Sequence, residues 1–207
     1  MKTINSKSMK AAFLMSITFL FFLFSCNSQT NTNGQKVTFG IHELVIISEI
    51  PNAIIDTLKS KNIQIETNQQ QSVIGYILKA DSTTLQINLS KQNRRFVKTV
   101  YQVDKEQKYC AVVAIRSNSV IDNSHIKKTK VNGKNVEIYF NYEGAKKWAE
   151  LTKKNIGKKI AVVIENQIYT MPLINSEIRN GVALINNLES EILANRISES
   201  LNSSISN

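Results

Sequence analysis

After residue 36 the chain consists of short apolar runs that predict strands, interrupted by three segments with helical spacing. The strand-like runs cover 37–47, 63–66, 73–80, 85–90, 108–115, 126–131, 134–140, 159–164, 167–174 and 182–186. The helical segments begin after Pro51, Asn141 and Asn187. Strands and helices mix without a regular β-α-β alternation. We therefore expect an α+β fold, in which a mostly antiparallel sheet has its helices packed on one side.

The segment after Asn141 has the clearest helical pattern. Trp148 lies in the middle of an apolar arc that includes Ala145 and Leu151, while lysines and glutamates fill the rest of the helical wheel. Asn141 is a suitable N-cap, and Gly157 is a suitable residue to end the helix. We therefore expect Trp148 to be a core residue.

The turns are indicated by a few residues. Asn132 and Gly133 separate two strand-like runs, and this dipeptide favours a hairpin with a type I′ turn. The run 159–164 has no polar alternation, which is typical of a central strand. Glu165 and Asn166 form a tight turn into a run that contains Pro172. Because proline cannot donate a ladder hydrogen bond, that strand is either an edge strand or is broken there.

The N-terminus has the pattern of an export signal. Three lysines precede Ala11–Phe24, an apolar stretch that is too short to predict a spanning helix. Ser25 and a single Cys26 follow directly, and this arrangement resembles the lipobox of bacterial lipoproteins. We expect residues 1–25 to be a signal peptide, Cys26 to carry lipid, and 26–36 to be a flexible tether facing the periplasm. The alternative is an ordinary signal peptide or anchor with a chance cysteine.

Cys110 is the only other cysteine. If Cys26 is acylated, Cys110 has no partner within the chain, so an intrachain disulfide is excluded. Its context, YCAVVAI, predicts a small buried core residue rather than a nucleophile. We place a domain boundary after residue 107, which gives an N-terminal α+β lobe (37–107) and a C-terminal domain (108–207).

The chain is basic, with a formal net charge of +10, and the excess is local: residues 127–159 hold ten lysines and three glutamates. An exported lipoprotein rarely meets nucleic acid, so we expect no nucleic-acid partner, and anionic lipid headgroups fit the patch better. The alternative is a solvated face that keeps the protein soluble. The candidate contacts with a membrane or partner are the lysines on the exposed side of one helix: Lys146, Lys147, Lys153 and Lys154.

The stretch EGAKKWAELTKKNIGKKIAVVIENQIYTMPLINSEIRNGVALI resembles the head part of the first periplasmic domain of the SecD/SecDF protein-export membrane proteins. The matching positions are Glu143, Gly144, Ala145, Lys146, Trp148, Ala149, Thr152, Asn155, Gly157, Lys158, Ala161, Val163, Pro172, Ile174, Ile178 and Gly181. Two positions depart from the family pattern, since Asn166 and Asn180 replace glycines. The resemblance covers roughly Tyr109 to Leu201. Residues 37–107 match only faintly and would be a reduced version of the base that carries the head in this family.

The resemblance implies a domain that engages exported polypeptides or translocase subunits. The family's transmembrane bundle and its proton-coupling acid are missing from the sequence, so we do not expect a proton-driven translocase subunit. A lipid-anchored copy of the head would retain the polypeptide-binding role alone. The alternative is a lipid-anchored interaction or immunity-like module that reuses the fold for an unrelated partner.

Catalytic patterns are missing from the sequence. His42 and Glu43 begin a zinc-protease pattern, but Ile46 occupies the position of its second histidine. His125 is the only other histidine, and the chain has no nucleophile elbow and no phosphate-binding loop. We therefore predict a non-catalytic protein with no metal site and no cofactor.

Overall fold

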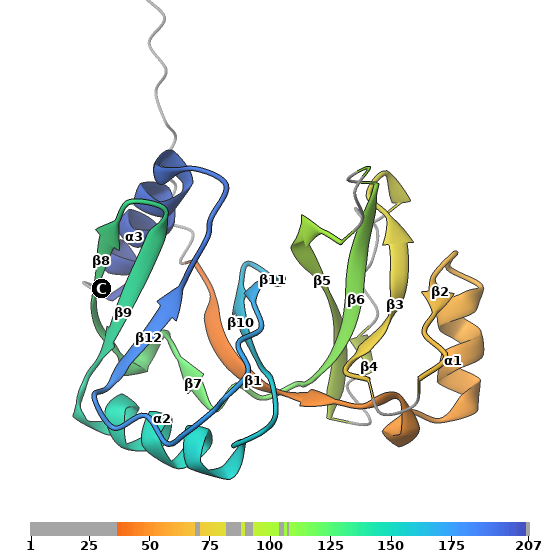
Figure 1. Cartoon of the computed structure of the whole chain (residues 1–207), viewed down its shortest axis with the longest axis horizontal. Helices are drawn as coiled ribbons and strands as arrows, with labels where there is room; N and C mark the ends of the chain where they lie inside the picture. The colour runs from red at the N-terminus through yellow and green to blue at the C-terminus, as the bar shows by residue number, and fades with distance from the viewer. Residues whose placement is uncertain are drawn as a thin grey trace, which may run out of the picture. The chain divides into compact units, whose positions relative to one another are not determined.

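The structure is a computed structural model that describes residues 37–68, 71–81, 88–89, 93–103, 106 and 108–205. The described residues belong to one compact unit (Figure 1). The predicted signal peptide, Cys26 and the predicted tether lie outside the described residues. None of the helices in the described part of the chain is long and apolar enough to span a bilayer.

The described helices and strands confirm the predicted α+β class. Their order is β1 (Phe39–Val45), η1 (Ile47–Glu49), α1 (Asn52–Lys59), β2 (Gln64–Ile65), β3 (Val73–Leu78), β4 (Asn88–Leu89), β5 (Arg94–Gln102), β6 (Tyr109–Arg116), β7 (Ile121–Asp122), η4 (Asn123–His125), β8 (Ile126–Asn132), β9 (Asn135–Phe140), α2 (Tyr142–Lys154), β10 (Ile160–Ile164), β11 (Gln167–Thr170), β12 (Val182–Ile185) and α3 (Glu191–Ile205).

The strands form two sheets rather than the single sheet that the sequence predicts. The larger sheet has the order β2-β3-β6-β1-β10-β11-β5-β4, with β7 beside β1 and an additional pairing of β5 with β6. The smaller sheet has the order β12-β9-β8. Among the described strands every pair is antiparallel except β11 with β5, where Gln167 aligns with Lys98 and Ile168 with Thr99. As predicted, β10 is a central strand, and all five of its residues are buried.

Strand β1 takes part in three hydrophobic clusters, and it runs from β7 and β10 to β6 and α1 (Figure 1). Phe39 and Ile41 belong to the head core, which also contains Trp148 and the apolar faces of β9, β12 and α3. Leu44 packs against a second cluster inside the larger sheet, and Val45 joins a third cluster with α1. Residues before 107 therefore contribute to the core of the C-terminal half. The boundary after residue 107 stays a prediction.

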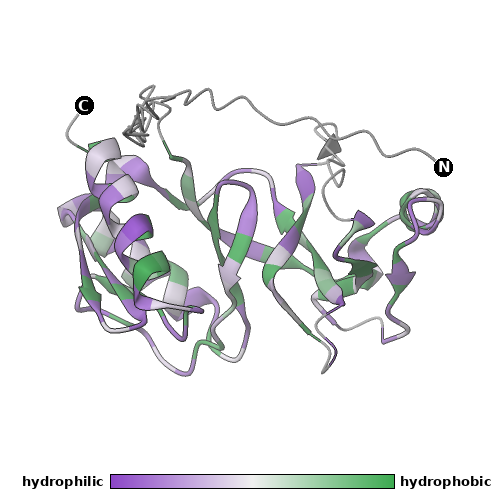
Figure 2. Cartoon of the chain, turned by 90° about the horizontal axis from the view of Figure 1, so that it is seen from above, coloured by the Kyte–Doolittle hydropathy of each residue, from purple (hydrophilic) through white to green (hydrophobic). Residues whose placement is uncertain are grey.

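Hydrophobic and hydrophilic residues are interspersed along the strands and helices, as the colouring in Figure 2 shows. On β9, Val136, Ile138 and Phe140 are buried, while the residues between them are partly exposed. On β6, Cys110 is 3% exposed, which confirms the prediction of a small core residue.

The start and the packing of helix α2 depend on residues that the sequence analysis identified. The Asn141 side chain accepts a hydrogen bond from the Gly144 backbone N–H at 2.9 Å, which confirms the N-cap. Gly144 is required by a close approach, because a Cβ atom there would lie 2.6 Å from the His125 carbonyl oxygen. Trp148 is 3% exposed, its ring centre lies 5.8 Å from that of Phe140, and its indole N–H donates to the Val182 carbonyl. The prediction of a core tryptophan is confirmed.

The predicted type of one hairpin turn is wrong, while the predicted tight turn at Glu165 and Asn166 is confirmed. In the β8–β9 hairpin Asn132 pairs with Asn135, so the turn residues are Gly133 and Lys134. Among the described residues, Gly133 but not Lys134 has a positive φ, so the predicted type I′ turn is wrong, since that turn needs a positive φ at both positions. The β10–β11 turn meets that condition instead, with φ of 50° at Glu165 and 60° at Asn166. Asparagine tolerates this conformation, which explains the loss of the family glycine.

Candidate functional site

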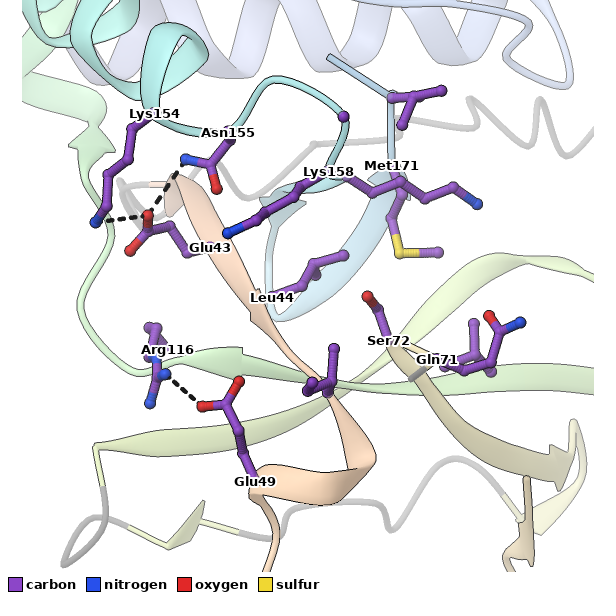
Figure 3. Close-up of a pocket in the computed structure, with 15 residues that line it drawn as sticks. Glu43, Leu44, Glu49, Gln71, Ser72, Arg116, Lys154, Asn155, Lys158 and Met171 are labelled. Atoms are coloured by element: carbon purple, nitrogen blue, oxygen red, sulfur yellow. Dashed lines mark hydrogen bonds and ion pairs between the residues drawn. The ribbon is translucent and has the colours of Figure 1, made fainter. Parts of the chain in front are cut away.

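A cavity of about 590 Å³, called the cleft below, lies where β1 leaves the head core (Figure 3). One wall comes from the second half of β1, the residues before β3 and the end of β6. The other wall comes from the end of α2, the residues that lead into β10, and the segment after β11. The lining residues are Glu43, Leu44, Ile46, Glu49, Gln71, Ser72, Val73, Arg116, Lys154, Asn155, Gly157, Lys158, Lys159, Met171 and Leu173.

Two ion pairs line the cleft, and the one between Lys154 and Glu43 joins its two walls. Lys154 Nζ lies 3.0 Å from Glu43 Oε1, and the Asn155 amide donates to the same oxygen at 3.2 Å. Partial burial raises the pKa of the Glu43 carboxyl, but the hydrogen bonds from Lys154 and Asn155 outweigh this effect and leave the pKa below its ordinary value. Arg116 pairs with Glu49 at 2.6 Å. Both carboxylates of the cleft are therefore already neutralised by a cation.

Two further lysines of the cleft have no such partner. Lys158 and Lys159 are exposed, and the part of the chain that the structure describes offers neither of them an ion pair. Figure 3 shows the Lys158 side chain reaching into the cleft, on the side of Glu43 and Leu44. The cleft thus combines apolar lining residues with an excess of positive charge.

A second cavity of about 350 Å³, called the groove below, lies along β12. Its lining is uncharged and mostly apolar, and consists of Trp148, Val162, Pro172, Leu173, Ile174, Asn175, Ser176, Ile178, Val182, Ala183, Leu184 and Asn186. Within the described residues β12 pairs with β9 alone, so its other side is an edge of the sheet. The groove follows this edge.

The edge of β12 is closed at Val182. The Asn180 side chain accepts from the Val182 N–H at 3.1 Å, and the Trp148 indole donates to the Val182 carbonyl at 3.1 Å. Asn180 replaces a family glycine, and here it caps an edge amide. Because outward-facing backbone groups alternate along a strand, the next outward position is Leu184, a residue that is 47% exposed. Leu184 is therefore the open position of this edge.

Leu173 connects the two cavities, since it lines both of them. Its side chain is 52% exposed, although Ile174 beside it is buried in the head core. Pro172 ends the strand pattern as predicted, because β11 stops at Thr170. The segment after β11 therefore presents an exposed apolar side chain between the cleft and the groove.

The four lysines that the sequence proposed as contacts differ in their surroundings. Lys146 and Lys153 are exposed on α2. Lys147 lies 3.2 Å from Glu143 and 2.8 Å from the His125 ring, and Lys154 belongs to the cleft. Lys146 and Lys153 thus project into solvent, while Lys147 and Lys154 are tied to neighbouring side chains. A role in membrane or partner contact stays a prediction.

His42 is a buried side chain with hydrogen bonds to its neighbours. It is 2% exposed, and its Nδ1–H donates to the Arg116 carbonyl at 2.9 Å, which leaves Nε2 to accept from Arg95 at 3.0 Å. Arg95 also donates to the Asn166 side chain at 2.8 Å. Burial lowers the pKa of the His42 imidazole to about 4, and the positive charge of Arg95 adds to this effect. His42 is therefore a neutral connector between β1, β5 and the β10–β11 turn. No cluster of metal-ligating side chains occurs among the described residues.

Comparison with known families identifies the C-terminal half of the chain. Residues 97–205 match the model of the family described as SecDF, P1 head subdomain, and the match covers more than half of the 207 residues. This chain belongs to the SecDF P1 head family. The predicted resemblance to this head is confirmed, and the match begins within β5, somewhat earlier than the sequence indicated.

Relatives of this P1 head are parts of much longer proteins. The chain is 36% identical over 74 residues to a protein translocase subunit SecD of Rhodothermus marinus, covering 36% of this chain and 12% of that protein. It is 46% identical over 55 residues to a protein translocase subunit SecDF of Thermus thermophilus, covering 27% of this chain and 8% of that protein. This chain therefore spans only a small share of the length of these relatives.

Solved structures are also similar to this P1 head. One is described as "Structure and function of a membrane component SecDF that enhances protein export". It has 20% sequence identity and a TM-score of 0.47, and the alignment covers 82% of this chain and 64% of the other.

The cleft and the groove were missed by the sequence reasoning. The alternation around Pro172 contained a usable signal, because a buried Ile174 places Leu173 on the opposite side of the chain. The same reasoning on the run VALI places Leu184 opposite the buried Ala183 and Ile185. No pattern in the sequence indicated that Leu173 and Leu184 lie on one cavity.

Proposed function

We propose that this chain is a lipid-anchored, non-catalytic envelope protein that binds extended segments of exported polypeptides in the groove beside β12. Membership of the SecDF P1 head family supports a role linked to protein export. The observation that carries the proposal is the uncharged groove along the partly open edge of β12, with Leu173 and Leu184 exposed on it.

The chemistry of the groove suits an unfolded chain. An extended segment can add to a sheet edge through backbone hydrogen bonds, which do not depend on sequence, while alternate side chains enter apolar pockets. The open position at Leu184 supplies the edge, and Trp148, Val162 and Ile174 supply part of the apolar wall. Because Val182 is already capped, only a short stretch of edge is open, so binding should be weak and reversible.

A direct binding measurement tests this proposal. The full-length chain in a non-ionic detergent is titrated against a fluorescein-labelled peptide of alternating Val and Thr, with empty micelles as the blank. Leu184→Asp and Leu173→Asp should each weaken binding roughly tenfold, because a carboxylate against apolar surface costs more than about 1.4 kcal/mol.

Ile192→Asp is the matched control for these variants. Ile192 is 73% exposed on α3 and does not line the groove, so the same chemical change there should leave the anisotropy curve unchanged. If the Leu173 and Leu184 variants bind like the wild type, the groove is not the polypeptide site.

The lipid anchor is the second part of the proposal. The apolar stretch before Ser25-Cys26 supports acylation of Cys26 after removal of residues 1–25. Cells fed a clickable fatty acid should label the wild-type protein, while Cys26→Ala should lose both the label and the membrane fraction. A labelled, membrane-bound Cys26→Ala protein would contradict the anchor.

The periplasmic orientation follows from the same anchor. The residues after Cys26, NSQTNTNGQ, contain no acidic run, which some Gram-negative groups use to send lipoproteins to the cell surface. An impermeant protease added to intact cells should therefore spare the protein and should cleave it once the outer membrane is opened. Cleavage in intact cells would overturn this orientation.

A further inference from the structure

The cleft and the groove share a firmly held wall. Backbone hydrogen bonds join the segment after β11 to the residues between α2 and β10: the Gly157 N–H donates to the Ile174 carbonyl at 2.8 Å, and the Ile174 N–H donates to the Lys158 carbonyl at 2.9 Å. Leu173 projects from this wall and lines both cavities. An extended chain in the groove therefore passes Leu173 to reach the cleft.

The two cavities differ sharply in charge. The groove has no charged residue in its lining. The cleft has four cations, Arg116, Lys154, Lys158 and Lys159, against two carboxylates, and both carboxylates already pair with a cation. The positive charge that remains comes from Lys158 and Lys159, which lie on the wall next to Leu173. A segment that spans both cavities thus meets an uncharged site followed by a cationic one.

We infer that the cleft selects acidic side chains, so that the preferred ligand of this chain is an extended segment in which an apolar stretch is flanked by Asp or Glu. This inference rests on the proposed polypeptide binding in the groove and adds a charge preference to it. The apolar residues occupy the groove and contact Leu184, the chain crosses Leu173, and a flanking carboxylate pairs with Lys158 or Lys159. Basic flanks are repelled by the same lysines.

The size of the preference follows from the exposure of the lysines. Ion pairs between exposed groups are individually weak, so two lysines should favour a Glu-flanked over a Gln-flanked peptide by roughly fivefold at low salt. Because exposed charges are screened, the preference should shrink as the ionic strength rises, while the apolar contribution should persist.

Three peptides with one Val/Thr core and flanks of Glu, Gln or Lys test the inference by fluorescence anisotropy with the full-length chain in non-ionic detergent. The expected order of affinity is Glu, then Gln, then Lys. The double variant Lys158→Gln/Lys159→Gln should remove this order. The matched control is Lys146→Gln/Lys153→Gln, which removes the same charge from the exposed face of α2 outside the cleft and should keep the order.

The outcomes separate this inference from the proposed function. Equal binding of the three peptides, with binding still lost in Leu184→Asp, would overturn the charge preference and leave the groove as a polypeptide site. An equal loss of preference in both double variants would overturn the assignment to the cleft, because it would show an effect of net charge alone. If no peptide binds the wild type, both the proposed function and the inference are wrong.

Discussion

The head core around Trp148 and the smaller core beneath α1 are held together in different ways. The smaller core is built from aliphatic side chains, Phe96 and Cys110, and it joins α1 to the neighbouring strands β3 and β6. The head core also contains buried polar side chains with specific partners: Thr129 contacts the Ser198 hydroxyl at 2.7 Å, and the Thr152 hydroxyl donates to the Trp148 carbonyl and accepts from the Ile178 N–H. Apolar contacts alone require only that the side chains fill the core, whereas these hydrogen bonds also fix which residues lie against one another.

This difference explains where the family resemblance lies. Aliphatic residues of similar volume can replace one another in a core at small cost. Thr152, Asn155 and Gly144 are harder to exchange, because each makes a hydrogen bond or close approach that few residue types supply. A recognisable residue pattern therefore persists in the head, and most of the smaller core lies before residue 97, where the family match begins.

The largest expected effect comes from Trp148→Ala. The change leaves a cavity in the head core and removes the donor to the Val182 carbonyl, so we expect a loss of about 3–5 kcal/mol in the free energy of unfolding. Thermal melting followed by circular dichroism measures it. Lys146→Ala on the exposed face of the same helix is the control and should melt like the wild type. An unchanged melting temperature for Trp148→Ala would remove Trp148 from the core.

The free energy of unfolding should depend on pH to a similar extent because of His42, which lies on β1, the strand that both cores share. The imidazole titrates near 6.5 in the unfolded chain and at about 4 in the folded protein. Between these values only the unfolded state binds the proton, so stability falls as the pH drops from 6.5 to 4, by on the order of 3 kcal/mol. Urea unfolding at a series of pH values measures this slope.

His42→Gln isolates that contribution, because glutamine retains a donor and an acceptor but does not titrate. The variant should lose most of the slope between pH 6.5 and 4. A slope equal to that of the wild type would assign the acid sensitivity to other groups.

The contrast between the two cores is tested by a pair of isosteric or nearly isosteric changes. Thr152→Val leaves the Ile178 N–H without its acceptor, so it should cost about 1–3 kcal/mol. Ile74→Val in the smaller core removes one methylene and should cost about 1 kcal/mol. Chemical denaturation of the two variants in parallel gives both values. If Thr152→Val is the milder change, hydrogen bonding does not distinguish the cores.

The smallest effect should come from the cap of α2. Asn141→Ala removes the acceptor of the Gly144 N–H and should cost about 1 kcal/mol, whereas Asn141→Asp should restore most of the stability. By contrast, α1 begins after Pro51 with no side-chain cap. A difference in melting temperature between the Ala and Asp variants is the required measurement, and equal values would mean that the cap contributes nothing.

The sequence predicted local elements well and their long-range contacts poorly. The helix around Trp148 and the buried strand 160–164 follow from periodicity within one segment. The type of the β8–β9 turn was wrong because pairing of Asn132 with Asn135 moved the turn by one residue. The cleft could not be foreseen, since it joins Glu43, Arg116, Lys158 and Met171 from four distant segments. The parallel contact of β11 with β5 is likewise invisible to a local pattern.

Because β1 pairs with a strand made much later in synthesis, it also affects how soon the protein can fold. Synthesis delivers Phe39 and Ile41 early, but their strand partners Ile164 and Val162 are among the last strand residues to be made. Such distant pairing slows folding, because a long loop must close before any contact stabilises it. Until then two apolar side chains near the start of the chain stay exposed to other proteins. The pairing of β1 with β10 is therefore expected to form late, after most of the chain has been synthesised.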